Sequence, residues 1–263
     1  MIEARRHYEK EGYVVLRDIG VSAELEPLQQ LIYDITAPLI EPHDASLPLA
    51  VRLRLPFARV PTDAEWSHLM RTVNESAEFK HMVEAPGVRQ TFAAMLGVEP
   101  RRFPICVFRA QVPQQRRAVY RWHQDEGTWY AVPVATLAYK MPGTLWLSIN
   151  GADTTNSIEL IPRSHRCGLR LHRMVEGQGL FDADPPSDLP EPVAMSTSPG
   201  DGVLFNALTF HRSIVAGSLT PRYSADLRYY DPTARGEYEV DPLLLRQRET
   251  LISAHSASSS IRG

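Results

Sequence analysis

Beyond Pro100, the chain consists of short hydrophobic runs separated by turn-forming residues. The runs have the length and the β-branched and aromatic content of strands, and they cover residues 103–111, 118–122, 144–149, 158–161, 193–197, 203–206, 210–215 and 223–230. Pro-Gly, Asn-Gly and Pro-Gly-Asp-Gly sequences between them favour tight turns. About eight strands of this length predict a double-sheet jelly roll, the double-stranded β-helix of cupin-like proteins.

The N-terminal part of the chain has helical patterns instead. Hydrophobic residues recur at helical spacing after Ser22, and Pro38 ends that pattern. In chain order we expect a helix over residues 3–11, a strand over 13–16, a helix from Ser22 to Pro38, a loop over 40–62 with a short extended piece at 51–55, a helix from Thr62 or Asp63 to about residue 81, and a helix over 88–96 that ends at Gly97. The predicted fold class is mainly β with N-terminal helices.

We expect the 263 residues to form one domain, because single all-β barrels of this size are common. Helical elements would lie mostly in residues 1–100 and the jelly-roll core in about 101–231. A polar tail over about 247–263 would be flexible, and the proline-rich interval 176–192 would be a surface excursion between strands.

Composition and charge exclude several classes of partner. The formal net charge is −3, with 43% hydrophobic and 22% charged residues, so neither nucleic acid nor a membrane is an expected partner. No segment has the apolar length of a membrane span or the pattern of a secretion signal, which favours a cytoplasmic location. Cys106 and Cys167 are expected to be reduced thiols. The oligomeric state stays open.

His123 and Asp125 are separated by one residue in a segment with an extended pattern. Residues i and i+2 of a strand point to the same face, so the imidazole and the carboxylate would lie side by side. Both groups suit iron, and a second histidine would complete the two-histidine, one-carboxylate face of non-heme Fe(II) sites. Taken alone the motif is weak evidence, because such a tripeptide also occurs as a packed histidine with a hydrogen-bonded partner.

His211 is the expected third ligand, because strands that are distant in sequence face each other in a jelly roll. An iron oxygenase of this kind uses a five-carbon dicarboxylate as its cosubstrate, and the distal carboxylate needs a buried arginine. Arg222, on the next strand, is placed for that role, and Ser213 shares the face of His211 and can donate a second hydrogen bond. Arg228 is a competitor, but it lies roughly 20 Å further along an extended strand, so both cannot hold one carboxylate.

Short motifs with a fairly specific order and spacing extend over most of residues 7–231. They are Tyr-Glu-Lys-Glu-Gly-Tyr-Val-Val-Leu-Arg-Asp at 8–18, Trp-His-Gln-Asp at 122–125, Ile-Glu-Leu-Ile-Pro-Arg-Ser-His at 158–165 and Gly-Asp-Gly-Val-Leu-Phe at 200–205, followed by His211, Ser213 and Arg222. Together they resemble the phytanoyl-CoA dioxygenase family, whose members are Fe(II)- and 2-oxoglutarate-dependent oxygenases with a jelly-roll core.

The resemblance implies a set of site residues and a reaction class. Fe(II) would be held by His123, Asp125 and His211, and 2-oxoglutarate by Arg222 and Ser213 in a pocket that Trp146 lines. With O2 as the other cosubstrate, the protein would oxidise, by default hydroxylate, a C–H bond of a small organic molecule and release succinate and CO2. Because the aspartate is present, the halogenase variants of the family are disfavoured.

Substrate contacts are expected at Gln111, Trp129 and Tyr130, which flank the pocket, and at Arg163, where the family usually has glycine. One alternative function is a cupin-like metal- or ligand-binding protein without turnover, which would not need Arg222. Another is an enzyme of the same fold that uses its metal as a Lewis acid without oxygen. The substrate, and the choice among hydroxylation, desaturation, cyclisation and epimerisation, stay open.

Overall fold

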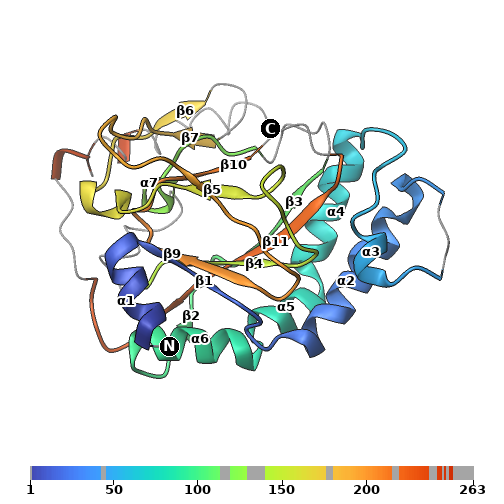
Figure 1. The fold of residues 1–263 in the computed structure, drawn as a ribbon, viewed down its shortest axis with the longest axis horizontal. Coiled ribbons are helices and arrows are strands. Elements are labelled where there is room, and N and C mark those ends of the chain that lie inside the picture. Colours follow the sequence, from blue (N-terminus) through green and yellow to red (C-terminus); the bar gives the residue numbers. More distant parts are fainter. Residues whose placement is uncertain are drawn as a thin grey trace.

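A large antiparallel sheet lies at the centre of the molecule (Figure 1). The computed structural model describes residues 2–42, 46–112, 119–128, 140–175, 180–214, 219–236, 242–244, 246 and 249–250. In spatial order the large sheet contains β1 (Tyr13–Leu16), β9 (Gly202–Phe205), β4 (Thr144–Ser148), β11 (Arg222–Leu227) and β3 (Val107–Gln111). A smaller antiparallel sheet contains β10 (His211–Ser213), β5 (Ile158–Leu160) and β8 (Val193–Ala194).

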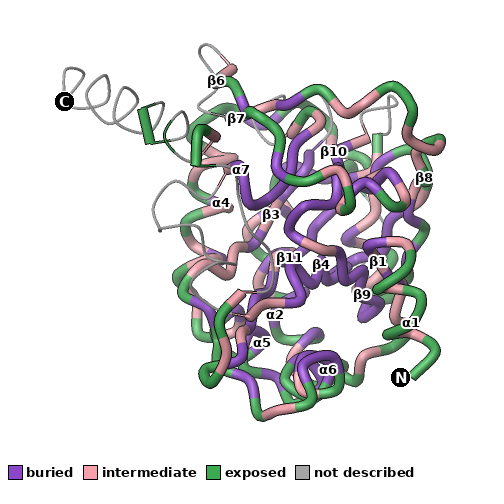
Figure 2. The backbone as a smooth tube through the Cα atoms, turned by 90° about the vertical axis from the view of Figure 1, so that its left-hand side faces the viewer, coloured by how far each residue is buried: buried purple, intermediate pink, exposed green. Residues whose placement is uncertain are grey.

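The two faces of the large sheet bury different side chains, because successive residues of a strand point to opposite faces. On its outer face, Leu145, Leu147 and Ala225 belong to a hydrophobic cluster shared with the helices. On its inner face, Trp146 and Val203 pack against the smaller sheet. Figure 2 shows that these central strands are almost continuously buried. Burial on both faces explains why the strands read as nearly continuous hydrophobic runs.

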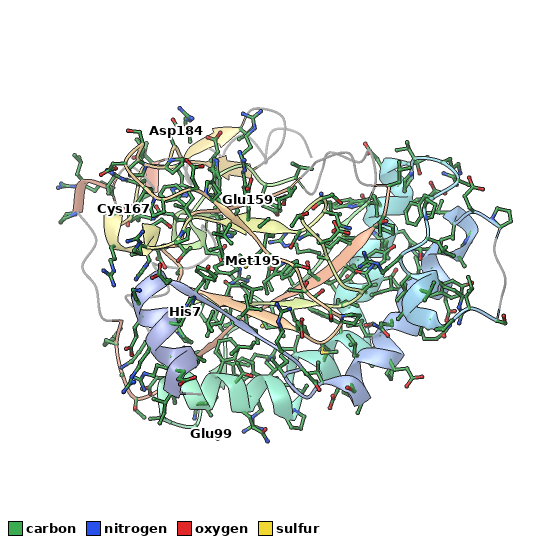
Figure 3. The ribbon with its side chains drawn as sticks, viewed as in Figure 1. His7, Glu99, Glu159, Cys167, Asp184 and Met195 are labelled. Carbon is green, nitrogen blue, oxygen red and sulfur yellow. The ribbon has the colours of Figure 1, made fainter. Side chains whose placement is uncertain are left out.

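The inner faces of the two sheets form one packed layer. Trp146, Val203 and Phe205 of the large sheet share a cluster with Ile158 and Leu160 of the smaller one. Met195, labelled near the middle of Figure 3, belongs to the same cluster. Two antiparallel sheets packed face to face confirm the predicted jelly roll.

Helices cover the outer face of the large sheet. They are α2 (Ser22–Thr36), α4 (Asp63–Glu75), α5 (Ala77–Val83) and α6 (Pro86–Leu96), with α1 (Ile2–Glu11) packed beside β1 and short turns at η1 (Ala37–Leu39), α3 (Leu49–Arg52), α7 (Asp125–Thr128) and η2 (Ser164–Cys167). Gly97, with φ of 76°, ends α6 in the left-handed conformation that glycine tolerates best. Within the described part of the chain, no helix is long and apolar enough to cross a membrane.

Several local predictions were wrong. The helix expected from residue 62 or 63 to 81 is divided at Ser76, which is extended (ψ 158°) and accepts a hydrogen bond from the N–H of Phe79 to begin α5. Residues 51–55 are not extended, because Leu49–Arg52 forms the single turn α3. Described residues 119–122 form no strand, although His123 pairs with β10 through an isolated bridge.

The predicted surface excursion at 176–192 contains a strand, which pairs with a strand just before the interval. These strands are β7 (Leu180–Asp182) and β6 (Arg173–Val175), and another short pair joins β2 (Arg101–Arg102) to β12 (Tyr229–Tyr230). Of the expected flexible tail, only residues 249–250 are described. The single-domain organisation stays a prediction.

Candidate active site

His123 and His211 are brought together by direct backbone pairing. The N–H of each donates to the carbonyl of the other, both at 3.1 Å, and their ring centroids lie 4.1 Å apart. The sequence pattern predicts that Asp125 lies on the same strand as His123, and this prediction was wrong. Asp125 begins the helical turn α7, which bends the chain and carries the carboxylate back towards both imidazoles.

Gln124, between the two predicted ligands, anchors this bend. Its fully buried side chain is held by hydrogen bonds of 2.7–2.8 Å to the carbonyls of Gly168 and Leu208 and the N–H of Arg170. His172 accepts a hydrogen bond from the N–H of Gln124 at 2.9 Å and packs directly against Gly127, where a Cβ would lie 2.1 Å from the ring. His172 therefore supports the bend, and only glycine fits at position 127.

Three electron-pair donors converge at the site with no proton between them. His123 Nδ1 donates to the carbonyl of Arg121 at 2.8 Å, and His211 Nδ1 donates to that of Thr209 at 3.0 Å, so each Nε2 carries a lone pair. The Nε2 atoms lie 3.9 and 3.6 Å from Asp125 Oδ1, longer than a hydrogen bond. Burial lowers the pKa of His123 well below its usual value, which keeps the ring neutral.

The second oxygen of Asp125 is engaged from the opposite side. Oδ2 accepts hydrogen bonds from Arg228 Nη2 at 2.9 Å and from the Thr144 hydroxyl. Burial by itself would raise the pKa of Asp125, but the Arg228 charge, the two imidazoles and the Thr144 hydrogen bond together outweigh burial and hold that pKa well below the usual range. Sequence reasoning missed Thr144 and considered Arg228 only as a competitor for the cosubstrate. The alternation along β11, which places Arg228 on the inner face, was the available signal.

Arg222 is buried on the inner face of β11 without a charged partner. Its side chain is 3% exposed, its guanidinium carbon lies 5.4 Å from the centre of the Trp146 ring, and it makes no hydrogen bond or ion pair with any described residue. Burial lowers the pKa of Arg222 to about 10, which still leaves it charged at neutral pH. A buried unpaired cation beside an aromatic wall is suited to receive an anion.

Other polar atoms around Arg222 also lack partners. Ser148 Oγ, Ser224 Oγ and Gln111 Oε1 are buried and unbonded within the described part of the chain, and Gln111 is the register partner of Arg222 on β3. Among the described residues, Ser213 Oγ accepts a hydrogen bond from the N–H of Tyr120 at 3.3 Å, and its own hydroxyl proton can still donate. Of these described groups, the Arg222 guanidinium and the hydroxyls of Ser148 and Ser224 lack acceptors, which a small dicarboxylate would supply, whereas Gln111 Oε1 lacks a donor.

Only two of the predicted substrate contacts, Gln111 and Arg163, lie within the described residues. Trp129 and Tyr130 lie outside the described residues. Gln111 donates to the carbonyl of Ile214 at 2.7 Å and lies beside Arg222. Arg163 is left-handed (φ 64°), which accounts for a preference for glycine there, and its half-exposed side chain lies 3.7 Å from Glu11 of α1. These substrate roles stay predictions.

A cavity of about 620 Å³ adjoins the strand that carries His211. Tyr120 and Ser213 line it together with charged residues of both signs. Two arginines that line the cavity are paired with carboxylates, Arg212 with Glu159 and Arg173 with Asp182. The cavity therefore offers polar contacts without a strong net charge.

The donor set fits a first-row transition metal. The ligand atoms of His123, Asp125 and His211 all lie within 4.8 Å of one another, and all three residues are buried. Donors that bind one ion at about 2.1 Å lie roughly 3 to 4 Å apart, in line with the separations between Asp125 Oδ1 and the two imidazoles. Two imidazoles and one carboxylate, with space left on the remaining side, are the ligand set of non-heme Fe(II) oxygenases.

Comparison with solved structures shows that other proteins have the same fold. The epimerase SnoN from nogalamycin biosynthesis, solved with Fe3+, alpha ketoglutarate and nogalamycin RO, is 16% identical with a TM-score of 0.56, covering 90% of this chain and 86% of SnoN. EvdO2 from Micromonospora carbonacea var. aurantiaca, complexed with 2-oxoglutarate, is 16% identical with a TM-score of 0.56, covering 91% of this chain and 94% of EvdO2. The apo form of EctD from S. alaskensis is 19% identical with a TM-score of 0.55, covering 95% of this chain and 84% of EctD.

Comparison by sequence identifies the family. No curated protein matches the chain. The family description of phytanoyl-CoA dioxygenase (PhyH) matches residues 8–222, which include the three candidate metal ligands and Arg222. The chain therefore belongs to the phytanoyl-CoA dioxygenase family of Fe(II)- and 2-oxoglutarate-dependent oxygenases.

Proposed function

We propose that this protein hydroxylates a C–H bond of a small organic molecule, using Fe(II), 2-oxoglutarate and O2 and releasing succinate and CO2. One observation carries the proposal. The interior of the jelly roll contains both a buried cluster of proton-free donors, His123, Asp125 and His211, and a buried unpaired cation, Arg222. A metal cluster alone would serve many proteins, whereas the second feature is needed only for an anionic cosubstrate.

Each residue has a distinct task in this proposal. His123, Asp125 and His211 would hold the iron, which when bound supplies the redox chemistry that couples decarboxylation of 2-oxoglutarate to C–H oxidation. Arg222 would grip the distal carboxylate through its planar guanidinium, and the Ser213 hydroxyl would donate a further hydrogen bond. The ring of Trp146, which lies 5.4 Å from the guanidinium carbon of Arg222, would form one wall of the pocket and exclude water, and this would strengthen the charge pairing.

The cavity that adjoins β10 supports a small-molecule substrate. Its volume of about 620 Å³ suits a metabolite-sized ligand. Named neighbours of the fold include an epimerase and a carbocyclase from nogalamycin biosynthesis, so one scaffold serves several outcomes. We propose hydroxylation because epimerisation or cyclisation would need additional groups in the site to direct the substrate after its hydrogen atom is removed. A cytoplasmic location is part of the same proposal.

Anaerobic titration with Fe(II) and then 2-oxoglutarate tests the centre directly. We expect a visible charge-transfer band from the chelate in the wild-type protein and a much weaker dependence on 2-oxoglutarate in Arg222→Met. A folded wild-type protein without the band would refute the proposal. Unchanged 2-oxoglutarate affinity in Arg222→Met would instead favour the cupin-like binding protein.

Turnover is tested by measuring succinate in air. With Fe(II), ascorbate and a panel of candidate metabolites, we expect succinate formation that rises above the uncoupled background when the substrate is present. Mass spectrometry of that substrate should then show a gain of one oxygen atom. Succinate that never exceeds the Asp125→Asn background would point to a Lewis-acid enzyme.

A further inference from the structure

We propose that Arg228, together with Thr144, is a positioning residue that commits Asp125 Oδ2 to the protein and leaves Oδ1 as the oxygen offered to the metal. The inference rests on the proposed metal site and assigns a role to two residues outside the ligand set. The observation is the buried hydrogen-bonded ring that joins these three side chains.

The ring is closed by two hydrogen bonds from one guanidinium. Arg228 Nη2 donates to Asp125 Oδ2 at 2.9 Å, and Arg228 Nε donates to Thr144 Oγ1 at 2.8 Å. The hydroxyl of Thr144 donates in turn to the same Oδ2 atom. Oδ2 thus accepts from two directions, while Oδ1 faces the imidazoles of His123 and His211.

Arg228 is itself rigidly placed. It is 2% exposed, its Nη1 donates to the carbonyl of Ile105 at 3.1 Å, and its Nη2 lies 3.9 Å from Asp226. Thr144 is fully buried at the start of β4, directly after the Pro142-Gly143 turn. The supporting groups thus come from β4 and from the end of β11, whereas Asp125 lies on α7. The framework of the sheet therefore sets the orientation of a carboxylate on a short irregular turn.

Holding Oδ2 affects how many coordination positions of a metal ion the Asp125 carboxylate can occupy. A carboxylate with both oxygens free can bind through one or both, and binding through both removes a position that ligands from solution would use. Holding Oδ2 with a charge-assisted hydrogen bond disfavours the second mode. Arg228 and Thr144 would thus keep open the positions that the cosubstrate and O2 need.

The test uses Co(II), because its visible spectrum reports coordination and its binding requires no turnover. In Arg228→Met and Thr144→Val, we expect Co(II) to bind about 10- to 100-fold more weakly, the usual cost of losing a partner that orients a ligand. We also expect both spectra to differ from the wild-type spectrum. Thr144→Ser keeps the hydroxyl and should restore both properties.

A matched control separates positioning from general stability. Arg17 also bridges a carboxylate and a carbonyl, donating to Asp201 at 2.6 Å and to Ser196 at 3.0 Å, but it lies at the end of β1 on the far edge of the sheet. Arg17→Met should bind Co(II) within about twofold of wild type. If Arg228→Met does not fold, Thr144→Val decides, because it preserves the shape of the side chain.

Two outcomes are distinguishable failures. If the folded wild-type protein does not bind Co(II), both the metal site and this inference are wrong. If wild type binds but folded Thr144→Val and Arg228→Met retain its affinity and spectrum, the inference alone is overturned and Arg228 is only a structural ion pair.

Discussion

Two buried arginines lie at opposite ends of β11, and they differ in whether the protein itself provides hydrogen-bond partners for them. Arg228, beyond the end of β11, donates hydrogen bonds to Asp125, Thr144 and a backbone carbonyl. Arg222, at the start of the same strand and on the same face, is equally buried and makes no hydrogen bond with any described residue. Burying a charge is costly unless it is paired. The fold therefore provides partners for the charge of Arg228, whereas Arg222 is suited to pair with a ligand.

One end of β11 thus contributes to the architecture, and the other end contributes to ligand binding. At the metal end, Arg228 and Arg109 are balanced by Asp125 and Asp226, with Arg109 Nε 3.0 Å from Asp226. At the other end, the described surroundings of Arg222 include the Trp146 ring and the unbonded polar atoms of Ser224 and Gln111. An arginine whose charge is paired within the protein stabilises the fold. A preorganised buried arginine without such a partner favours the binding of an anion.

The largest expected effect comes from removing a metal ligand, which eliminates the site that Arg228 is proposed to organise. His211→Ala should reduce Fe(II) binding to below detection in an anaerobic titration and abolish succinate formation, because only one imidazole and one carboxylate remain. His68→Ala, at an exposed histidine of α4, is the control and should bind iron like the wild-type protein. Measurable iron binding by His211→Ala would show that another residue holds the metal.

Removing the satisfied arginine should be strongly destabilising. Arg228→Met leaves the buried carboxylate of Asp125 without this counter-charge, and breaking a buried pair costs about 3–5 kcal/mol. Urea unfolding of the metal-free protein measures the loss. A loss below about 1 kcal/mol would mean that the two ends of β11 do not differ in the way proposed.

Removing Arg222, the arginine without a charged partner, should have the opposite effect on stability. Arg222→Met should leave the metal-free protein as stable as wild type or raise its free energy of unfolding by roughly 1–3 kcal/mol, because an uncompensated buried charge disappears. The same variant should bind 2-oxoglutarate about 10- to 100-fold more weakly, as expected for losing charge-assisted hydrogen bonds. Calorimetry with 2-oxoglutarate and Mn(II) checks the affinity, and Ser213→Ala should show a smaller loss.

The smallest expected effect belongs to an exposed counterpart of the Arg228 pair. Arg59 pairs with Glu65 in the capping box of α4, and the hydrogen bond from Arg59 lowers the pKa of Glu65 to about 2. Because the folded pKa is depressed, the contribution is present above about pH 4.5 and is lost as the pH falls towards 2. Arg59→Met should lower the melting temperature only slightly at pH 7, and the difference should vanish near pH 2. A difference that persists there would contradict this origin.

How much of the fold was predictable depended on whether a local pattern determined it. The hydrophobic runs and turn residues after Pro100 predicted the jelly roll, because each buried strand carries its own signal. The division of the helix at Ser76 was missed, since serine is tolerated within helices and only its extended ψ of 158° reveals the break. The extended piece at 51–55 was wrong because a single helical turn is too short to show a period.

For the site, the sequence by itself determined which chemical groups are available. They are the closely spaced His123 and Asp125, a later His211, and a serine and an arginine after it. Tertiary structure alone decided that Asp125 begins a helical turn, that Arg228 reaches it across 103 residues of sequence, and that Arg222 is left without a partner. The physical reason is that the sequence reports periodicity within a few residues. Which buried charge meets which partner depends on how strands far apart in the chain are placed beside one another.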